Sequence, residues 1–300
     1  MLTLAIPAPD FSREFALGPL EVRWYAITML LGITIGAWIS ARRWKAQGGE
    51  ADDILELTLW AVGGGLVGAR LWHVITSYDQ LGDEWYAVFN IRSGGLGIWG
   101  GVAVGSLAVA WAARRKGINV GKLANAVAPG LLIGQGIGRL GNYINQELFG
   151  GPTDLPWALE VDPRFRPLSY AETAGFHPTF LYEMLWNFAL AGVLIWLGSR
   201  FMMRPWSLFA LYVAGYSLGR LFWEQLRIDP SNEFLGQRVN FWVALVLMLG
   251  ALAFFVWNQR RTAPGSGDGP DADDSRRRSR RGGRRPVKAK GGRVRLAISR

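Results

Sequence analysis

Two long uncharged stretches constrain this chain more than any other feature of its sequence. Twenty-one residues without Asp, Glu, Lys or Arg separate Arg92 from Arg114, and another 21 separate Arg238 from Arg260. A helix of about 20 apolar residues is long enough to cross a hydrocarbon core of about 30 Å. Soluble proteins seldom carry even one such stretch, so we predict a membrane protein.

Seven apolar segments are predicted to span the membrane, which makes the expected fold class an all-α polytopic membrane protein. The segments cover roughly residues 20–41, 54–74, 94–113, 121–138, 179–199, 205–223 and 239–258.

Basic residues mark alternate connections between these segments. The clusters are Arg42, Arg43 and Lys45 after the first segment, Arg114, Arg115, Lys116 and Lys122 after the third, and Arg200 and Arg204 after the fifth. A further basic run follows the seventh segment, whereas the loop at 75–92 contains Asp79, Asp83 and Glu84. The positive-inside rule therefore places the N-terminus outside and the C-terminus in the cytoplasm.

The net charge of +10 belongs to one tail. Residues 260–300 hold 14 Lys/Arg against 4 Asp/Glu, while residues 1–259 hold 19 of each. We predict a seven-helix transmembrane domain over 1–259 and a disordered basic cytoplasmic tail over 260–300. Anionic lipid headgroups are a better expected partner for this tail than nucleic acid. The chain has no cysteine, and we expect no metal site and no cofactor.

Charged residues inside the predicted segments gather toward one side of the membrane. With the orientation above, the outer ends receive three arginines and two glutamates, which are Arg70, Arg139, Arg220, Glu183 and Glu224. Tyr216, Arg220 and Glu224 share one helix face, and the structural alternative is that Arg220 and Glu224 only neutralise each other. Surplus guanidinium groups at this depth suit a lipid phosphate, because arginine matches phosphate oxygens with paired N–H donors.

Two other classes of membrane protein remain alternatives at this point. A transporter with an outward-facing cavity for an anionic substrate would distribute its charges through the membrane depth, often with internal repeats. A phosphatidyltransferase would need a cluster of metal-binding carboxylates, and residues 15–258 contain no closely spaced aspartates of that kind.

One polar segment on the outer side carries a longer signature. The sequence GRLGNYINQELFG at 138–150 closely resembles the signature of the prolipoprotein diacylglyceryl transferase family. Supporting matches are Trp24-Tyr25, GARLWHV around Arg70, HPTFLYE at 177–183 and GYSLGRLFWEQLR at 215–227. The Gly, Asn and Pro content of 138–167 predicts that this stretch forms a turn-rich cap.

The resemblance implies an enzyme at the outer leaflet that transfers the diacylglyceryl group of phosphatidylglycerol to the cysteine thiol of a prolipoprotein signal peptide. A thioether forms and glycerol phosphate leaves. By motif match, Arg139 and Arg220 are implied to be essential. The implied lesser site residues are Tyr25, Asn142, Glu147, Gly150, Glu183, Tyr216 and Glu224. We expect the two arginines to stabilise the departing phosphate, with Glu224 and Tyr216 orienting Arg220.

The general base is left open. Some family members have a histidine in the glycine-rich start of the third segment, but Trp99 stands there in this chain. His177 is a substitute candidate, although a histidine before proline is more often a capping or packing residue. Neighbouring arginines can also lower the pKa of a thiol, which would make a base unnecessary.

Overall fold

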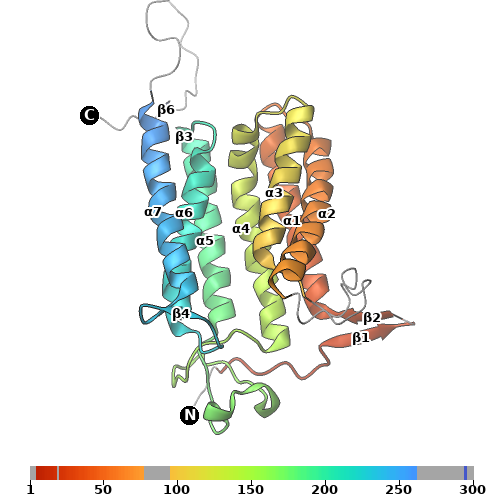
Figure 1. Ribbon diagram of the computed structural model, residues 1–300, viewed down its shortest axis with the longest axis vertical. Coiled ribbons are helices and arrows are strands. Elements are labelled where there is room, and N and C mark those ends of the chain that lie inside the picture. The colour runs from red at the N-terminus through yellow and green to blue at the C-terminus, as the bar shows by residue number, and fades with distance from the viewer. Residues whose placement is uncertain (1–4, 19, 78–94, 262–293, 296–300) are drawn as a thin grey trace, which may run out of the picture.

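A computed structural model describes residues 5–18, 20–77, 95–261 and 294–295, and these residues contain seven α-helices that lie side by side (Figure 1). They are α1 (Trp24–Lys45), α2 (Ala51–Thr76), α3 (Ile98–Arg115), α4 (Val120–Asn145), α5 (Thr179–Arg200), α6 (Ser207–Leu226) and α7 (Val239–Arg260). By length and composition, α1, α2, α5 and α7 could each cross a membrane. The predicted all-helical architecture with long apolar spans is confirmed.

Helix α4 lies at the centre of the bundle. It packs against α1, α5 and α6, while α2 pairs with α3 and α6 with α7. Most of the face that α4 buries consists of Gly, Ala and Leu, whereas α7 buries only Ala244. An apolar helix so exposed, with Val246 and Leu249 more than half accessible, is suited to contact with lipid.

Glycines bring the backbones of α1 and α4 into direct contact. A Cβ atom on Gly32 would lie 2.7 Å from the carbonyl oxygen of Gly134, and one on Gly36 would lie 2.7 Å from that of Gly130. Neither backbone carbonyl can move aside cheaply, because each belongs to a helix. Small residues at such crossings are the usual means by which membrane helices approach closely.

Two of the predicted helix boundaries are wrong. Residues 20–23 were expected in the first helix, but they form β2 (Leu20–Arg23), which pairs with β1 (Glu14–Leu17) through a turn with Gly18 at φ 61°. The fourth helix was expected to end near 138, but α4 continues to Asn145, so GRLGNYIN is helical rather than part of the cap. It ends where Gln146 adopts a left-handed backbone.

A cap covers one end of the bundle. It comprises residues 146–178 and includes two 3₁₀-helices, η3 (Pro163–Phe165) and η4 (Leu168–Tyr170). Its core consists of Phe149, Leu159, Val161 and Phe176, which pack in one cluster with Phe180 of α5. In Figure 1 the cap lies below the helices, at the same end as β1, β2 and the short strand β4 (Glu233–Phe234), which pairs with β5 (Gln237–Arg238). The predicted cap is therefore present, although it begins at Gln146.

The opposite end of the bundle carries the basic clusters. Arg42, Arg43 and Lys45 lie in the last turn of α1, and Arg114 and Arg115 lie in that of α3. Strand β3 (Phe201–Met202) pairs with β6 (Val294–Arg295) at this end. The acidic loop residues Asp79, Asp83 and Glu84, and the tail from 262 apart from β6, lie outside the described residues.

The α1–α4 contact yields a stability prediction. We expect Gly32→Ala to destabilise the protein by about 1–3 kcal/mol, because the added methyl group overlaps a backbone carbonyl. Gly192→Ala is the matched control, because a Cβ at this position meets nothing within 4 Å. Alanine in place of a helical glycine should leave the stability unchanged or raise it. Thermal unfolding in detergent measures both, and equal melting temperatures would contradict the close packing.

Candidate active site

A cluster of ion pairs joins α4, α5 and α6 at the capped end of the bundle. Arg139 near the end of α4 pairs with Glu183 near the start of α5. Arg220 on α6 lies with its Nη1 3.6 Å from Oε1 of the same Glu183, and it also pairs with Glu224. Glu183 and Glu224 have side chains only 5% and 1% exposed, and a buried carboxylate of this kind is tolerated where cations contact it.

The two carboxylates divide their oxygens between separate arginines. Glu183 offers Oε2 to Arg139 and Oε1 to Arg220, so one carboxylate connects two guanidinium groups from different helices. The predicted pairing of Arg220 with Glu224 within one helix face is confirmed. Arg220 also has a second carboxylate partner, because Glu183 from a neighbouring helix contacts the same guanidinium. Mutual neutralisation within α6 therefore does not account for the cluster.

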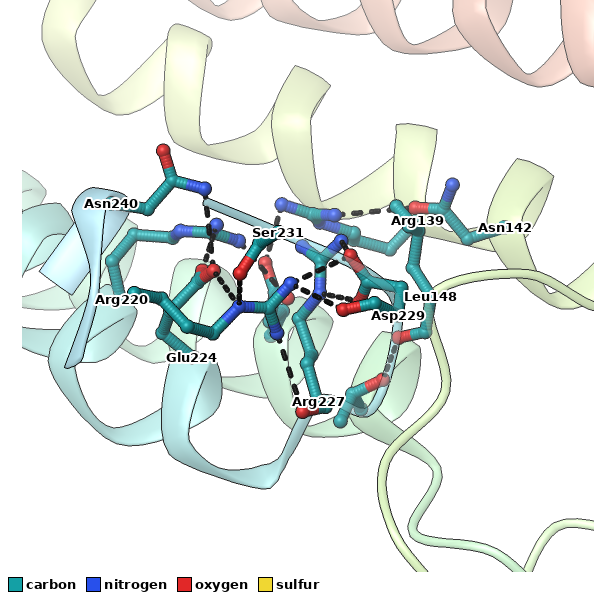
Figure 2. A network of polar contacts seen from close by, with 12 residues as sticks. Arg139, Asn142, Leu148, Arg220, Glu224, Arg227, Asp229, Ser231 and Asn240 are labelled. Atoms are coloured by element: carbon teal, nitrogen blue, oxygen red, sulfur yellow. Dashed lines mark hydrogen bonds and ion pairs between the residues drawn. The ribbon is translucent and has the colours of Figure 1, made fainter. Parts of the chain in front are cut away.

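The loop between α6 and α7 extends this cluster with residues that the sequence analysis did not single out. Nε of Arg238 lies 3.1 Å from Oε1 of Glu224, and its Nη2 lies 2.7 Å from Oδ2 of Asp229. Asp229 also accepts a 2.7 Å hydrogen bond from Nε of Arg227. Asn240, at the start of α7, donates to Glu224 over 3.2 Å. Figure 2 shows this continuous network between the helix ends.

The charge of Asp229 is held by its two arginines. Burial by itself raises the pKa of this carboxyl group. The hydrogen bonds and positive charges of Arg227 and Arg238 outweigh that effect, and the pKa lies below its usual value. Asp229 is therefore ionised at neutral pH and anchors both arginines.

Positive charge exceeds negative charge within this ion-paired group. Its four arginines and three carboxylates are Arg139, Arg220, Arg227, Arg238, Glu183, Glu224 and Asp229. The arginine side chains are 9–17% exposed, so the excess charge is poorly screened by solvent. A site of this kind attracts an anion that can accept several N–H donors.

A tight turn after α4 fixes the next polar group. Oδ1 of Asn142 accepts a 3.2 Å hydrogen bond from Arg139, and its Nδ2 donates 2.9 Å to Glu147. Gln146 and Leu148 have φ angles of 49° and 58°, which residues other than glycine seldom adopt. The turn is held by Thr179, whose hydroxyl donates 2.5 Å to the carbonyl oxygen of Leu148. Arg139, Asn142 and Glu147 therefore form one connected arm of the network.

Gly150 and His177 lie where the cap meets the end of α6 and the start of α5. A Cβ on Gly150 would be 2.7 Å from that of His177 and 3.0 Å from the carbonyl oxygen of Leu226, so only glycine fits there without displacement. Nδ1 of His177 lies 3.3 Å from the hydroxyl of Tyr182. The position of His177 is that of a residue joining the cap to α5.

The remaining predicted site residues, and Trp99, lie on α1, α2, α3 and α6. The ring of Tyr25 packs against Gly141 of α4, and Tyr216 lies one turn before Arg220 with its ring 6.2 Å from that of Tyr212. Arg70 on α2 is buried and donates 3.1 Å to the carbonyl oxygen of Gly95. Trp99 is in the first turn of α3 and half-exposed.

The sequence of this chain is similar to that of a known enzyme family. The chain matches the profile of the family described as prolipoprotein diacylglyceryl transferase over residues 13–257. It is 46% identical over 276 residues to the phosphatidylglycerol–prolipoprotein diacylglyceryl transferase of Bifidobacterium adolescentis, covering 86% of this chain and 82% of that protein. The enzyme of the same name from Cutibacterium acnes and phosphatidylglycerol–prolipoprotein diacylglyceryl transferase 2 of Streptomyces coelicolor are each 45% identical to this chain. Those matches cover 87% of this chain and 89% of the first protein, and 85% of this chain and 81% of the second.

The extended network makes a prediction for Arg238. We expect Arg238→Met to destabilise the protein by about 3 kcal/mol, because it leaves Glu224 and Asp229 short of a buried cation. Arg164→Met is the matched control, since Arg164 forms an exposed pair with Asp162 and should leave the melting temperature nearly unchanged. Thermal unfolding in detergent compares the two. Equal effects would show that the burial of Arg238 contributes nothing.

Proposed function

Because this chain belongs to the prolipoprotein diacylglyceryl transferase family, we propose that its buried arginine cluster binds the phosphate of phosphatidylglycerol. The protein is a multi-pass membrane transferase that moves the diacylglyceryl group from phosphatidylglycerol to a prolipoprotein. What the proposal adds is the assignment of residues to this reaction.

The arrangement around Glu183 is the observation that carries this assignment. A single carboxylate accepts from Arg139 on one helix and Arg220 on another, as the two non-bridging oxygens of a phosphodiester also could. An anion that enters here replaces or joins Glu183 as the shared acceptor. The excess of one guanidinium over the carboxylates in the ion-paired group favours its entry.

The reaction places its electrostatic demand on the leaving group. The sulfur of the prolipoprotein cysteine forms a bond to the glycerol carbon, and the carbon–oxygen bond to phosphate breaks. The bonding electron pair leaves with the oxygen of glycerol phosphate, so negative charge grows on the phosphate. Arg139 and Arg220 are fixed by the network before the substrate arrives, and preorganised donors of this kind stabilise developing charge effectively.

Other residues take supporting roles in the proposal. Glu224 and Tyr216 orient Arg220, and Asn142, held by Glu147, orients Arg139. Tyr25 and Gly150 shape the walls of the substrate site, and Arg70 adds positive charge from α2. His177 borders the site at the cap.

Proton removal from the thiol needs no dedicated base in this proposal. Trp99 cannot accept a proton, and the imidazole of His177 is directed to the Tyr182 hydroxyl. Guanidinium groups beside a cysteine favour its thiolate form, because they stabilise the anion more than the neutral thiol. The thiol proton then leaves to solvent or to the departing phosphate.

The proposed orientation places the cap outside and the basic helix ends in the cytoplasm of a bacterium, with all seven helices spanning its plasma membrane. The basic clusters at the end opposite the cap support this orientation. We also propose residues 1–259 as the catalytic domain, since the family match ends at residue 257. The 14 Lys/Arg of residues 260–300 would bind anionic lipid headgroups rather than nucleic acid.

Substitution of Arg220 tests the phosphate role. We expect Arg220→Lys to lower kcat/KM by at least about a hundredfold, because lysine offers a point charge in place of a planar fork. The assay follows thioether formation on a lipobox peptide supplied with phosphatidylglycerol. Arg139→Ala and Arg220→Ala should abolish the product almost completely. Arg164→Lys, at an exposed arginine of the cap, serves as control, and near-normal turnover of Arg220→Lys would refute the role.

Single introduced thiols test the orientation, since the chain has no cysteine of its own. We expect Leu168→Cys, at a cap residue 96% exposed, to react with a membrane-impermeant maleimide in intact cells. Gln47→Cys, between α1 and α2, should react only after the membrane is permeabilised. The reverse pattern would require the cap to face the cytoplasm.

A further inference from the structure

Two amide side chains in the bundle have polar atoms without partners. Asn187 on α5 is 2% exposed, and its Nδ2 has no hydrogen-bond partner within the described part of the chain. The same is true of Oε1 of Gln135 on α4, although the other end of that amide donates 3.0 Å to the hydroxyl of Tyr212. Buried polar groups are nearly always satisfied, so two orphaned amides in one bundle point to a missing partner.

These amides lie directly beneath the arginine cluster. Gln135 is four residues before Arg139, Asn187 is four residues after Glu183, and Tyr216 is four residues before Arg220. Helix α5 runs opposite to α4 and α6, so each step leads away from the cap (Figure 1). Four residues advance a helix by about 6 Å and return to nearly the same face. Since α4, α5 and α6 pack against one another, the three side chains form a second polar layer one turn deeper.

Apolar side chains begin immediately below this layer. The next residue on the buried face of α5 is Ala191, followed by Leu194, and both pack with Leu132 of α4. The layer therefore lies between the charged cluster and this apolar group of side chains. A phospholipid has its chemical groups in the corresponding order along its length, from the charged phosphate through the polar ester carbonyls to the apolar hydrocarbon chains.

We propose that this second layer, formed by Asn187 and Gln135, is a binding site for the ester carbonyl groups of the diacylglyceryl group being transferred. The proposal rests on the proposed phosphate site, because the phosphate fixes the depth of the lipid. The ester-bearing carbons follow the reacting carbon of the glycerol, so their carbonyl oxygens reach past it toward Asn187. Its Nδ2 donates to one of them.

Gln135 can serve the other ester in the same way. The Tyr212 hydroxyl both donates and accepts, so the Gln135 amide can turn over and keep this bond. Its N–H₂ group then faces the layer. Holding both esters fixes the reacting carbon between them and the arginines, where the thiol approaches.

Phosphatidylglycerol with ether-linked chains tests the proposal, because it has the same phosphate and no carbonyl oxygens. We expect the unmodified enzyme to use the diester lipid with a kcat/KM about tenfold above that of the diether lipid. In Asn187→Leu this ratio should fall to about threefold, through loss of turnover on the diester, because only the Gln135 contact to an ester remains. The same variant should melt at a higher temperature without lipid, because it removes an unsatisfied buried donor.

Controls separate this site from a structural effect and from the phosphate site. Asn125→Leu removes an equally buried amide whose bonds to Arg204 and Leu208 are complete, so it should lower stability and keep the tenfold ratio. Arg220→Lys should lower the turnover of both lipids equally. If Asn187→Leu is not recovered folded, Gln135→Leu provides the same comparison. An unmodified enzyme that does not distinguish the lipids, or a variant that keeps the full ratio, would overturn the proposal.

Discussion

The sharing of Glu183 between Arg139 and Arg220 is the interaction on which this end of the structure depends. A buried carboxylate is tolerated only where cations reach it, so α4, α5 and α6 must bring their ends together on the same side. The cap and the close α1–α4 contact then act as supports. The cap closes over the cluster, and the glycine contact holds the central helix that carries Arg139.

Much of this cluster could be predicted because ionised groups inside membrane helices have few acceptable positions. Once alternate basic loops had set the direction of each helix, the charges at 139, 183, 220 and 224 fell at one depth. The structure brings these four side chains together. It contains the Arg220–Glu224 pair that the sequence suggested, and it adds the contacts of Glu183 with Arg139 and Arg220, which the sequence did not specify. For Arg70, the hydrogen bond described is to the Gly95 carbonyl, which belongs to the contact between α2 and α3.

Arg227, Asp229 and Arg238 could not be predicted by the same reasoning. All three lie at the ends of helices, where charged residues are common and carry little information. Their importance comes from the path of the loop between α6 and α7, which turns Arg238 back onto Glu224. The missed extension of α4 has a similar cause. The last turns of α4 are polar because they line the cluster and the cap. A prediction based on hydropathy assigns such polar residues to a loop.

The network also explains why a strained turn persists beside it. Gln146 and Leu148 adopt left-handed backbones at positions where glycine would be easier to accommodate, and such strain survives only where surrounding contacts hold it. The bonds of Thr179 to Leu148 and of Asn142 to Glu147 supply that restraint. Because Glu147 in the turn holds the Asn142 amide, which accepts from Arg139, the guanidinium is oriented from the cap as well as by Glu183. The arginine is thus fixed from two directions before any substrate binds, which is the condition for preorganised stabilisation of a departing phosphate.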